Sequence, residues 1–166
     1  MNARVSRAQR PVWLVMVLTL VLALLLAIAP IPASLDPYRP DWVALCLIYW
    51  NMETPDRFGI GTAWIAGLAM DVLYATPLGE QALADSVLAF FASGLHLRLR
   101  VFPRWQQALV TFALVGLSHL IMQIVQHATG HPGGNWSYWT SAAATALLWP
   151  LVYPILRYLH RRATAF

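Results

Sequence analysis

The stretch PVWLVMVLTLVLALLLAIA, residues 11–29, decides the class of this protein. Its nineteen residues carry no charge, and Thr19 is their only hydroxyl. A helix of that length reaches about 28 Å at 1.5 Å per residue, which is close to the thickness of the hydrocarbon core of a bilayer. The stretch therefore predicts a membrane-spanning helix.

The residues around this stretch leave one alternative. Arg4, Arg7 and Arg10 precede it, as basic residues do in a secretory signal, and Ala27-Ile28-Ala29 resembles a cleavage site. However, Pro30 follows that site, and the apolar run is longer than the 7–15 residues typical of a signal. We therefore expect an uncleaved first helix.

The composition extends this conclusion to the whole chain. Of its 166 residues, 59% are hydrophobic and 11% are charged, against about 45–50% and 25% in soluble domains. A soluble protein of this size could not cover its surface with so few charges. The single cysteine, Cys46, excludes a disulfide framework and a cysteine-based zinc or iron–sulfur cluster within one chain.

Hydropathy predicts six spans in one domain covering residues 1–166, because no linker is long enough to separate two domains. The predicted spans are residues 11–29, 41–53, 58–75, 82–97, 105–126 and 136–156. The second apolar run is short for a span and could instead be a re-entrant or interfacial piece. Pro150 and Pro154 should kink the last helix without ending it.

The arginines test this topology. If all six runs span and the N-terminus is cytoplasmic, ten of the eleven arginines lie in cytoplasmic segments, and only Arg39 lies outside. That asymmetry is the positive-inside rule. We therefore expect an all-α membrane protein with six transmembrane helices and both termini in the cytoplasm. Its net charge of +4 then sets orientation and can attract anionic membrane lipids, and gives no evidence for nucleic-acid binding.

Asp71 is the one acidic residue that the pattern predicts deep in a span. It shares a helix face with Gly59, Ala63 and Gly67, and small residues at this spacing let another backbone approach closely. Asp71 could be a proton or substrate site, or it could make a buried hydrogen bond between helices. We favour the second interpretation because no second deep carboxylate is expected. In that case Asp71→Asn should be tolerated, whereas Asp71→Leu should lower protein levels.

Two polar stripes mark helix sides that should face the bundle. They comprise Ser86, Ala89, Ser93 and His96 in the fourth run, and His119, Gln123 and Gln126 in the fifth. Such side chains form hydrogen bonds across helices, although a water-filled cavity is the alternative. Between the third and fourth runs, Thr76-Pro77-Leu78-Gly79 predicts a defined turn. This turn either connects two helices or holds the end of the Asp71 helix in place for a partner.

The sequence offers no convincing catalytic or metal site. Gly116-Leu117-Ser118-His119 faintly resembles the Gly-x-Ser pattern of intramembrane serine proteases, but nothing places a base beside the serine. His127 and His131 flank a Thr-Gly pair next to Pro132, where a helix is not expected, so we expect no zinc. We therefore expect a protein that is not an enzyme and needs no cofactor.

Four stretches in this order resemble the bacterial rod shape-determining protein family MreD. They are Arg39-Pro40-Asp41-Trp42 with Ile48-Tyr49-Trp50, Gly61–Gly67 with Asp71-Val72-Leu73 and Pro77-Leu78-Gly79, His96–Arg100, and Leu148–Leu151 with the arginines that follow. The resemblance covers essentially the whole chain. It places Asp71, Pro77 and Gly79 on the family's recurring Asp and Pro-Leu-Gly positions, and Arg39, Pro40 and Asp41 on the opening of its second span. The family has no catalytic residue to carry over.

The resemblance implies a non-enzymatic component of the cell-elongation machinery in the bacterial inner membrane, which supports lateral peptidoglycan synthesis and rod shape. The implied partners are MreC, which would bind directly, the MreB filament, a RodA-type glycosyltransferase and a class B penicillin-binding protein. Because the loops are short, a partner helix should dock on a small-residue face, such as that of Gly67 or Ser141–Ala146. The family is also similar to the substrate-binding subunits of energy-coupling-factor transporters, which implies an alternative function as a small-molecule-binding transport subunit with a site near Asp71.

Overall fold

The computed structural model describes residues 2–130 and 136–164, with side chains from Val12 onward. The described residues form six α-helices and one short 3-10 helix, and they contain no strand. The elements are α1 (Asn2–Ile28), η1 (Asp36–Tyr38), α2 (Trp42–Glu53), α3 (Ile60–Tyr74), α4 (Glu80–Val101), α5 (Arg104–Ala128) and α6 (Ser137–Thr164). Each apolar run therefore corresponds to one helix, and the all-helical class is confirmed.

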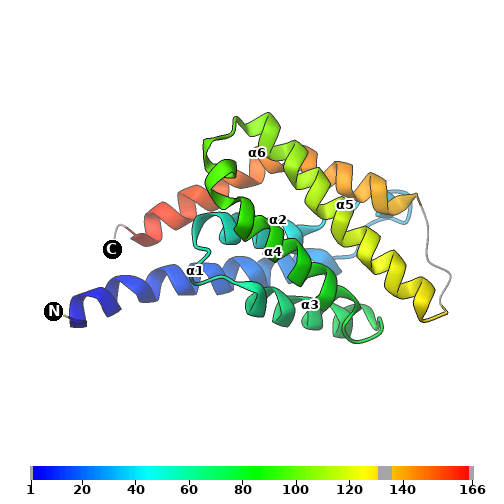
Figure 1. Cartoon of the computed structure of the whole chain (residues 1–166), viewed down its shortest axis with the longest axis horizontal. Helices are drawn as coiled ribbons and strands as arrows, with labels where there is room; N and C mark the ends of the chain where they lie inside the picture. Colours follow the sequence, from blue (N-terminus) through cyan, green and yellow to red (C-terminus); the bar gives the residue numbers. More distant parts are fainter. Residues whose placement is uncertain (1, 131–135, 165–166) are drawn as a thin grey trace.

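The helices form a bundle with both chain termini at the same end (Figure 1). We call this the terminal end, and it also holds the loop of residues 54–59 between α2 and α3. The opposite end, which we call the distal end, holds residues 29–41, including η1, and the turn of residues 75–79 between α3 and α4.

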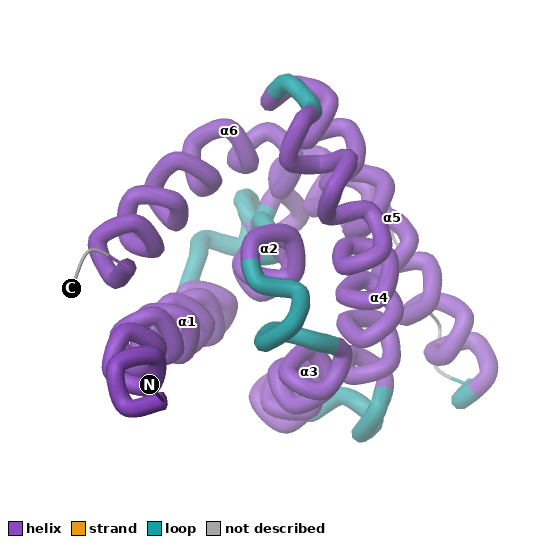
Figure 2. Tube along the Cα trace, turned by 60° about the vertical axis from the view of Figure 1, so that its left-hand side comes forward, coloured by secondary structure: helices purple, strands orange, loops and turns teal. Residues whose placement is uncertain are grey.

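The short helix α2 forms the centre of the bundle. Every residue from Val43 to Met52 is buried, because α1, α4, α5 and α6 all pack against α2 (Figure 2). A helix that is apolar on all sides belongs in such a position. At 12 residues α2 is about 18 Å long, against 27 residues in α1, so it is shorter than its neighbours.

The outer faces of the bundle are apolar, as in a membrane protein. Among the described residues, three helices are long and apolar enough to cross a bilayer: α4, α5 and α6. The apolar parts of α1 and α3, Val12–Ile28 and Ile60–Tyr74, are shorter. Large apolar side chains point outward, including Trp13, Ile65 and Leu147 at 62%, 68% and 78% exposure. Pro150 and Pro154 lie inside α6, which continues through both, as the sequence predicts.

Candidate functional site

Asp71, near the distal end of α3, accepts hydrogen bonds from the start of α4. One carboxylate oxygen, Oδ1, accepts the Gln81 N–H at 2.9 Å and the Thr76 hydroxyl at 3.0 Å. The other, Oδ2, accepts the Gly79 N–H at 2.8 Å and the Ala82 N–H at 3.5 Å. The side chain is fully buried. Asp71 thus caps a helix that follows it in sequence, and its negative charge lies at the positive end of that helix's dipole.

Gly67 allows α3 and α4 to approach closely enough for this cap. A Cβ at position 67 would lie 2.4 Å from the Ala82 Cα and 2.6 Å from the Ala82 nitrogen, which are both backbone atoms. Only glycine fits here, as the close-approach rule for small residues predicts. The partner of the Gly67 face is therefore α4 of the same chain.

The turn containing Pro77 and Gly79 completes the contact. Ala75 ends α3 in the left-handed region with φ of 52°, and Gly79 precedes α4 with φ of 103°, where glycine carries no steric cost. The Pro77 carbonyl accepts the Glu80 N–H at 3.2 Å. Because both Asp71 oxygens are occupied by groups of the chain itself, the geometry favours a buried structural role for Asp71 over a proton or substrate site.

Two further acidic side chains are buried in the first turns of α4. Glu80 is 1% exposed, and its Oε1 accepts the Gln126 amide N–H at 2.5 Å. The Gln126 carbonyl oxygen in turn accepts the Tyr138 hydroxyl at 3.2 Å, which links α4 to α5 and α6. Asp85, one turn further along α4, is 3% exposed.

Asp71 is therefore not the only carboxylate buried in the described part of the bundle, which the sequence did not predict. Glu80 and Asp85 lie at the start of the fourth apolar run. Acidic residues in this position are typical of the exposed end of a membrane span, so the sequence pattern does not show that they are buried. In the folded chain α2, α3 and α5 pack against α4, and Gln126 of α5 contacts Glu80. The hydrogen bond between Glu80 and Gln126 distinguishes a buried from an exposed Glu80, and it depends on tertiary packing.

Asp41 caps the N-terminus of α2 and connects it to two other helices. Its Oδ1 accepts the Ala44 N–H at 2.9 Å, and its own backbone N–H donates to the Thr145 hydroxyl of α6 at 2.8 Å. Its Oδ2 lies 3.8 Å from Nε2 of His119 on α5. Nδ1 of His119 lies 2.9 Å from the Tyr138 carbonyl and must donate to it, because a carbonyl oxygen only accepts.

Arg39 and Pro40 precede this cap at the distal end. The Arg39 guanidinium donates to the Ala29 carbonyl just beyond α1 and lies 3.8 Å from the Asp36 carboxylate of η1. The Arg39 carbonyl accepts the Ser141 hydroxyl of α6 at 2.7 Å. Arg39 thus joins the end of α1 to η1 and α6.

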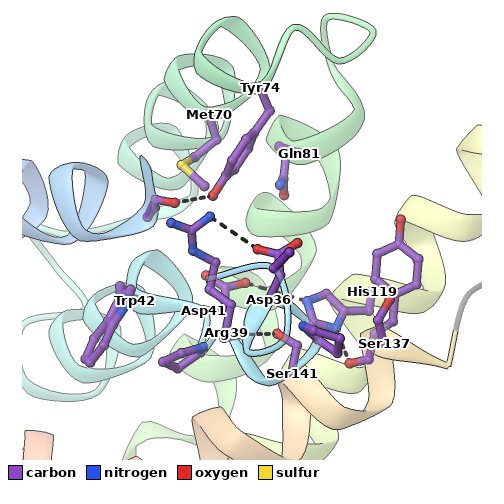
Figure 3. A pocket seen from close by; sticks show the side chains of 15 residues that line it. Asp36, Arg39, Asp41, Trp42, Met70, Tyr74, Gln81, His119, Ser137 and Ser141 are labelled. Carbon is purple, nitrogen blue, oxygen red and sulfur yellow. Dashed lines mark hydrogen bonds and ion pairs between the residues drawn. The ribbon is translucent and has the colours of Figure 1, made fainter. Parts of the chain in front are cut away.

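These groups surround a cavity of about 480 Å³ at the distal end, which we call the distal pocket (Figure 3). The lining combines one arginine and two aspartates with one histidine, aromatic rings and hydroxyl or amide groups. The residues labelled in Figure 3 are Asp36, Arg39, Asp41, Trp42, Met70, Tyr74, Gln81, His119, Ser137 and Ser141. A cavity with both charge signs and aromatic walls can hold a small polar molecule. Asp71 does not line it.

The structure separates the other predicted site residues from this pocket. Gln123 lies one turn beyond His119 on α5, is partly buried, and is not part of the lining. His96 lies near the C-terminal end of α4, at the terminal end of the bundle, with Nδ1 2.5 Å from the Ser93 carbonyl. His131 lies outside the described residues. The described part of the chain contains no group of three His, Cys, Asp or Glu side chains that could hold a metal.

Ser118, in the stretch that resembles a protease motif, is not placed for catalysis. It is 1% exposed, and its hydroxyl has no hydrogen-bond partner among the described residues. The neighbouring His119 is directed to Tyr138 and Asp41. A serine nucleophile requires a base within hydrogen-bond reach, and this arrangement supplies none.

Asp41→Ala should lower the thermal stability of the purified protein. The change removes the α2 cap, worth about 1 kcal/mol, because the Ala44 N–H loses its side-chain acceptor. Asp36→Ala is the matched control, because the Asp36 side chain is 65% exposed and its contact with Arg39 is a surface pair at 3.8 Å. The measurement is the midpoint of heat-induced loss of monodisperse protein in detergent. Equal midpoints for the two variants would contradict the role of Asp41.

Two comparisons with known proteins agree with each other over nearly the whole chain. The sequence profile of the family described as rod shape-determining protein MreD matches residues 8–159. The Rod shape-determining protein MreD of Haemophilus influenzae is 29% identical over 150 residues, which cover 90% of this chain and 93% of that protein. No solved structure matches the chain significantly.

Proposed function

The chain belongs to the MreD family of rod shape-determining proteins, and we propose that it acts as a non-enzymatic inner-membrane component of the cell-elongation machinery. In this role it supports lateral peptidoglycan synthesis and the maintenance of rod shape. The observation that carries the proposal is the family match over residues 8–159. Depletion should turn rod-shaped cells into spheres, and cells that keep their width and length after depletion would overturn the proposal.

We further propose a multi-pass arrangement with six spans and both termini in the cytoplasm. The support is the position of the termini at one end of the bundle (Figure 1) and the arginine asymmetry of the sequence. In this arrangement the terminal end faces the cytoplasm, and the distal pocket opens toward the periplasm. The short α2 is accommodated because protein, rather than lipid, surrounds it.

We propose that MreC is the direct partner and that its membrane helix docks on this bundle. Through MreC the protein would join an assembly with the MreB filament, a RodA-type glycosyltransferase and a class B penicillin-binding protein. The loops between the helices are short, so the helix flanks make up most of the available surface. The two small-residue faces expected to bind a partner are instead buried within the chain. Gly67 is covered by α4, and Ala142 and Thr145 of α6 are fully buried. The proposed docking surface is therefore one of the exposed apolar flanks.

Cysteine cross-linking in cells tests this proposal. Cys46 is the only cysteine, so Cys46→Ala gives a cysteine-free background. Single cysteines then replace exposed residues on three helices, Ile65 and Val72 on α3, Leu109 on α5 and Leu147 on α6, which are 60–78% exposed. Cysteines along the MreC membrane helix should cross-link to one of these flanks and not to the others.

Leu88→Cys is the control, because Leu88 is fully buried and should not react. Co-purification from detergent at native expression levels provides the second readout. If no position cross-links and the two proteins do not co-purify, direct binding to MreC is refuted. The shape phenotype would then require another contact.

A second candidate function is a small-molecule-binding transport subunit, which the distal pocket favours because of its volume and mixed charge. The proposed site differs from the one expected near Asp71, since Asp71 is occupied by the start of α4. This alternative predicts a bound molecule that is lost in His119→Ala, detected by native mass spectrometry. Empty protein, with no uptake defect on deletion, would argue against it.

A further inference from the structure

The terminal end of the bundle contains a recess that the proposed function does not use. Its volume is about 770 Å³, and its lining comes from α1, the loop after α2, α4 and α6. The recess lies where the short helix α2 ends, at Glu53, while α1, α4 and α6 continue around it. Figure 2 looks toward this end and shows α2 enclosed by the longer helices. We call this space the terminal recess.

The charged side chains that the structure describes in the terminal recess are balanced in sign. Arg100 donates to the Met52 and Glu53 carbonyls at 3.1 and 2.7 Å, and its guanidinium lies 3.8 Å from the Glu53 carboxylate. The Glu53 carboxylate also accepts the Tyr153 hydroxyl at 3.4 Å. Arg100 therefore caps the C-terminal end of α2 and pairs with the Glu53 carboxylate.

Arg57 and Asp56 remain as a second pair of opposite charges. Both line the recess and both are exposed, and neither has an ion pair or hydrogen bond to another side chain among the described residues. The imidazoles of His96 and His160 lie in the same lining. The described part of the recess thus offers an unpaired cation and an unpaired anion from adjacent residues, together with two imidazoles that can donate hydrogen bonds.

An apolar groove continues from the terminal recess along the outside of the bundle. It lies between α1 and α3, has a volume of about 180 Å³, and is lined by side chains such as Met16, Val17, Phe58 and Ile65. Arg57 lines both the recess and the groove. A polar recess and an apolar groove that meet at one arginine match a ligand with a charged head and a hydrocarbon tail.

We propose that the terminal recess and the groove between α1 and α3 bind one phospholipid with a phosphate and a primary ammonium, that is, a phosphatidylethanolamine. The Arg57 guanidinium binds the phosphate, as arginine does where phosphate is recognised. The Asp56 carboxylate binds the ammonium, and one acyl chain lies in the groove. Among the described residues of the lining, acidic and basic side chains are equal in number, which fits a zwitterionic headgroup better than an anionic one. This site does not depend on the proposed role in cell elongation.

The test uses the full chain reconstituted in nanodiscs of defined lipid composition and then released gently for native mass spectrometry. In discs that contain phosphatidylethanolamine and phosphatidylglycerol in equal parts, the protein should retain one phosphatidylethanolamine. In discs where phosphatidylcholine replaces it, retention should fall about tenfold, because a trimethylammonium cannot donate hydrogen bonds to Asp56. Retention of phosphatidylglycerol or phosphatidylcholine to the same extent would overturn the proposal.

Variants locate the site. Arg57→Gln and Asp56→Asn change exposed side chains, so the fold should persist, and each should reduce retention about tenfold. Arg98→Gln is the matched control, since Arg98 is an exposed arginine in the last turn of α4 that does not line the recess. Thr62→Trp should block the groove and displace the acyl chain. Equal lipid retention by wild type and Arg57→Gln, or an equal loss in Arg98→Gln, would refute the assigned site.

Discussion

Gly67→Ala is expected to prevent the protein from accumulating in the membrane, although it adds a single methyl group. That methyl would lie 2.4 Å from the Ala82 Cα and 2.7 Å from the Gln81 carbonyl carbon, and neither backbone atom can turn away as a side chain could. The helices α3 and α4 would have to separate, which also moves the α4 N-terminus away from Asp71. Overpacking typically costs about 1–3 kcal/mol, and loss of the cap adds to it, so we expect a loss of about 3 kcal/mol or more.

Gly61→Ala is the matched control on the same helix. A Cβ at position 61 meets nothing within 4 Å, so the methyl group has space. Alanine is favoured over glycine inside a helix by up to about 1 kcal/mol, so this variant should accumulate at least as well as wild type. Immunoblots of membranes and melting of the detergent-solubilised proteins measure both effects. Normal accumulation of Gly67→Ala would show that α3 and α4 do not pack as closely as the structure has them.

Asp71→Leu is expected to have the second large effect. It leaves the N–H groups of Gly79 and Gln81 and the Thr76 hydroxyl, all in partly buried residues, without their acceptor. An unpaired donor costs up to about 1–3 kcal/mol when it is buried, so three of them together remove a substantial part of the roughly 5–15 kcal/mol that stabilises a typical protein. We expect little folded protein in the membrane and a heat midpoint too low to measure.

Asp71→Asn separates the structural role from a proton-carrying one. The sequence alone suggests that asparagine is tolerated if Asp71 is structural. The structure changes this expectation, because both oxygens accept N–H donors and an asparagine must place its own NH₂ against one of them. Asp71→Asn should therefore lie between wild type and Asp71→Leu in stability, and loss of function should follow loss of protein. A variant that accumulates fully but cannot maintain cell shape would instead indicate a proton or ligand site.

Several features could be predicted from the sequence because they depend on local patterns. Uncharged runs such as residues 11–29 must be helical in a membrane, since only a helix satisfies its own backbone hydrogen bonds there. The bounds of α2, Trp42–Glu53, agree with the predicted run of residues 41–53 because Asp41 is a good N-cap and stands next to the first apolar residue. The four-residue spacing that ends in Gly67 and Asp71 also indicated a close helix contact. Each of these signals lies within one helix or at its ends.

The identity of the contacts could be decided only by the tertiary structure. Periodicity showed that Gly67 and Asp71 face another backbone, but not that this backbone is α4 rather than a partner helix. It could not show that Glu80 and Asp85 are buried, because their environment comes from helices distant in sequence. Arg39, Asp41 and His119 meet at the distal pocket, while His96 and Arg57 lie at the opposite end. The physical reason is that hydropathy fixes which segments are helices, whereas side-chain packing between helices fixes which polar groups lose water and which partners replace it.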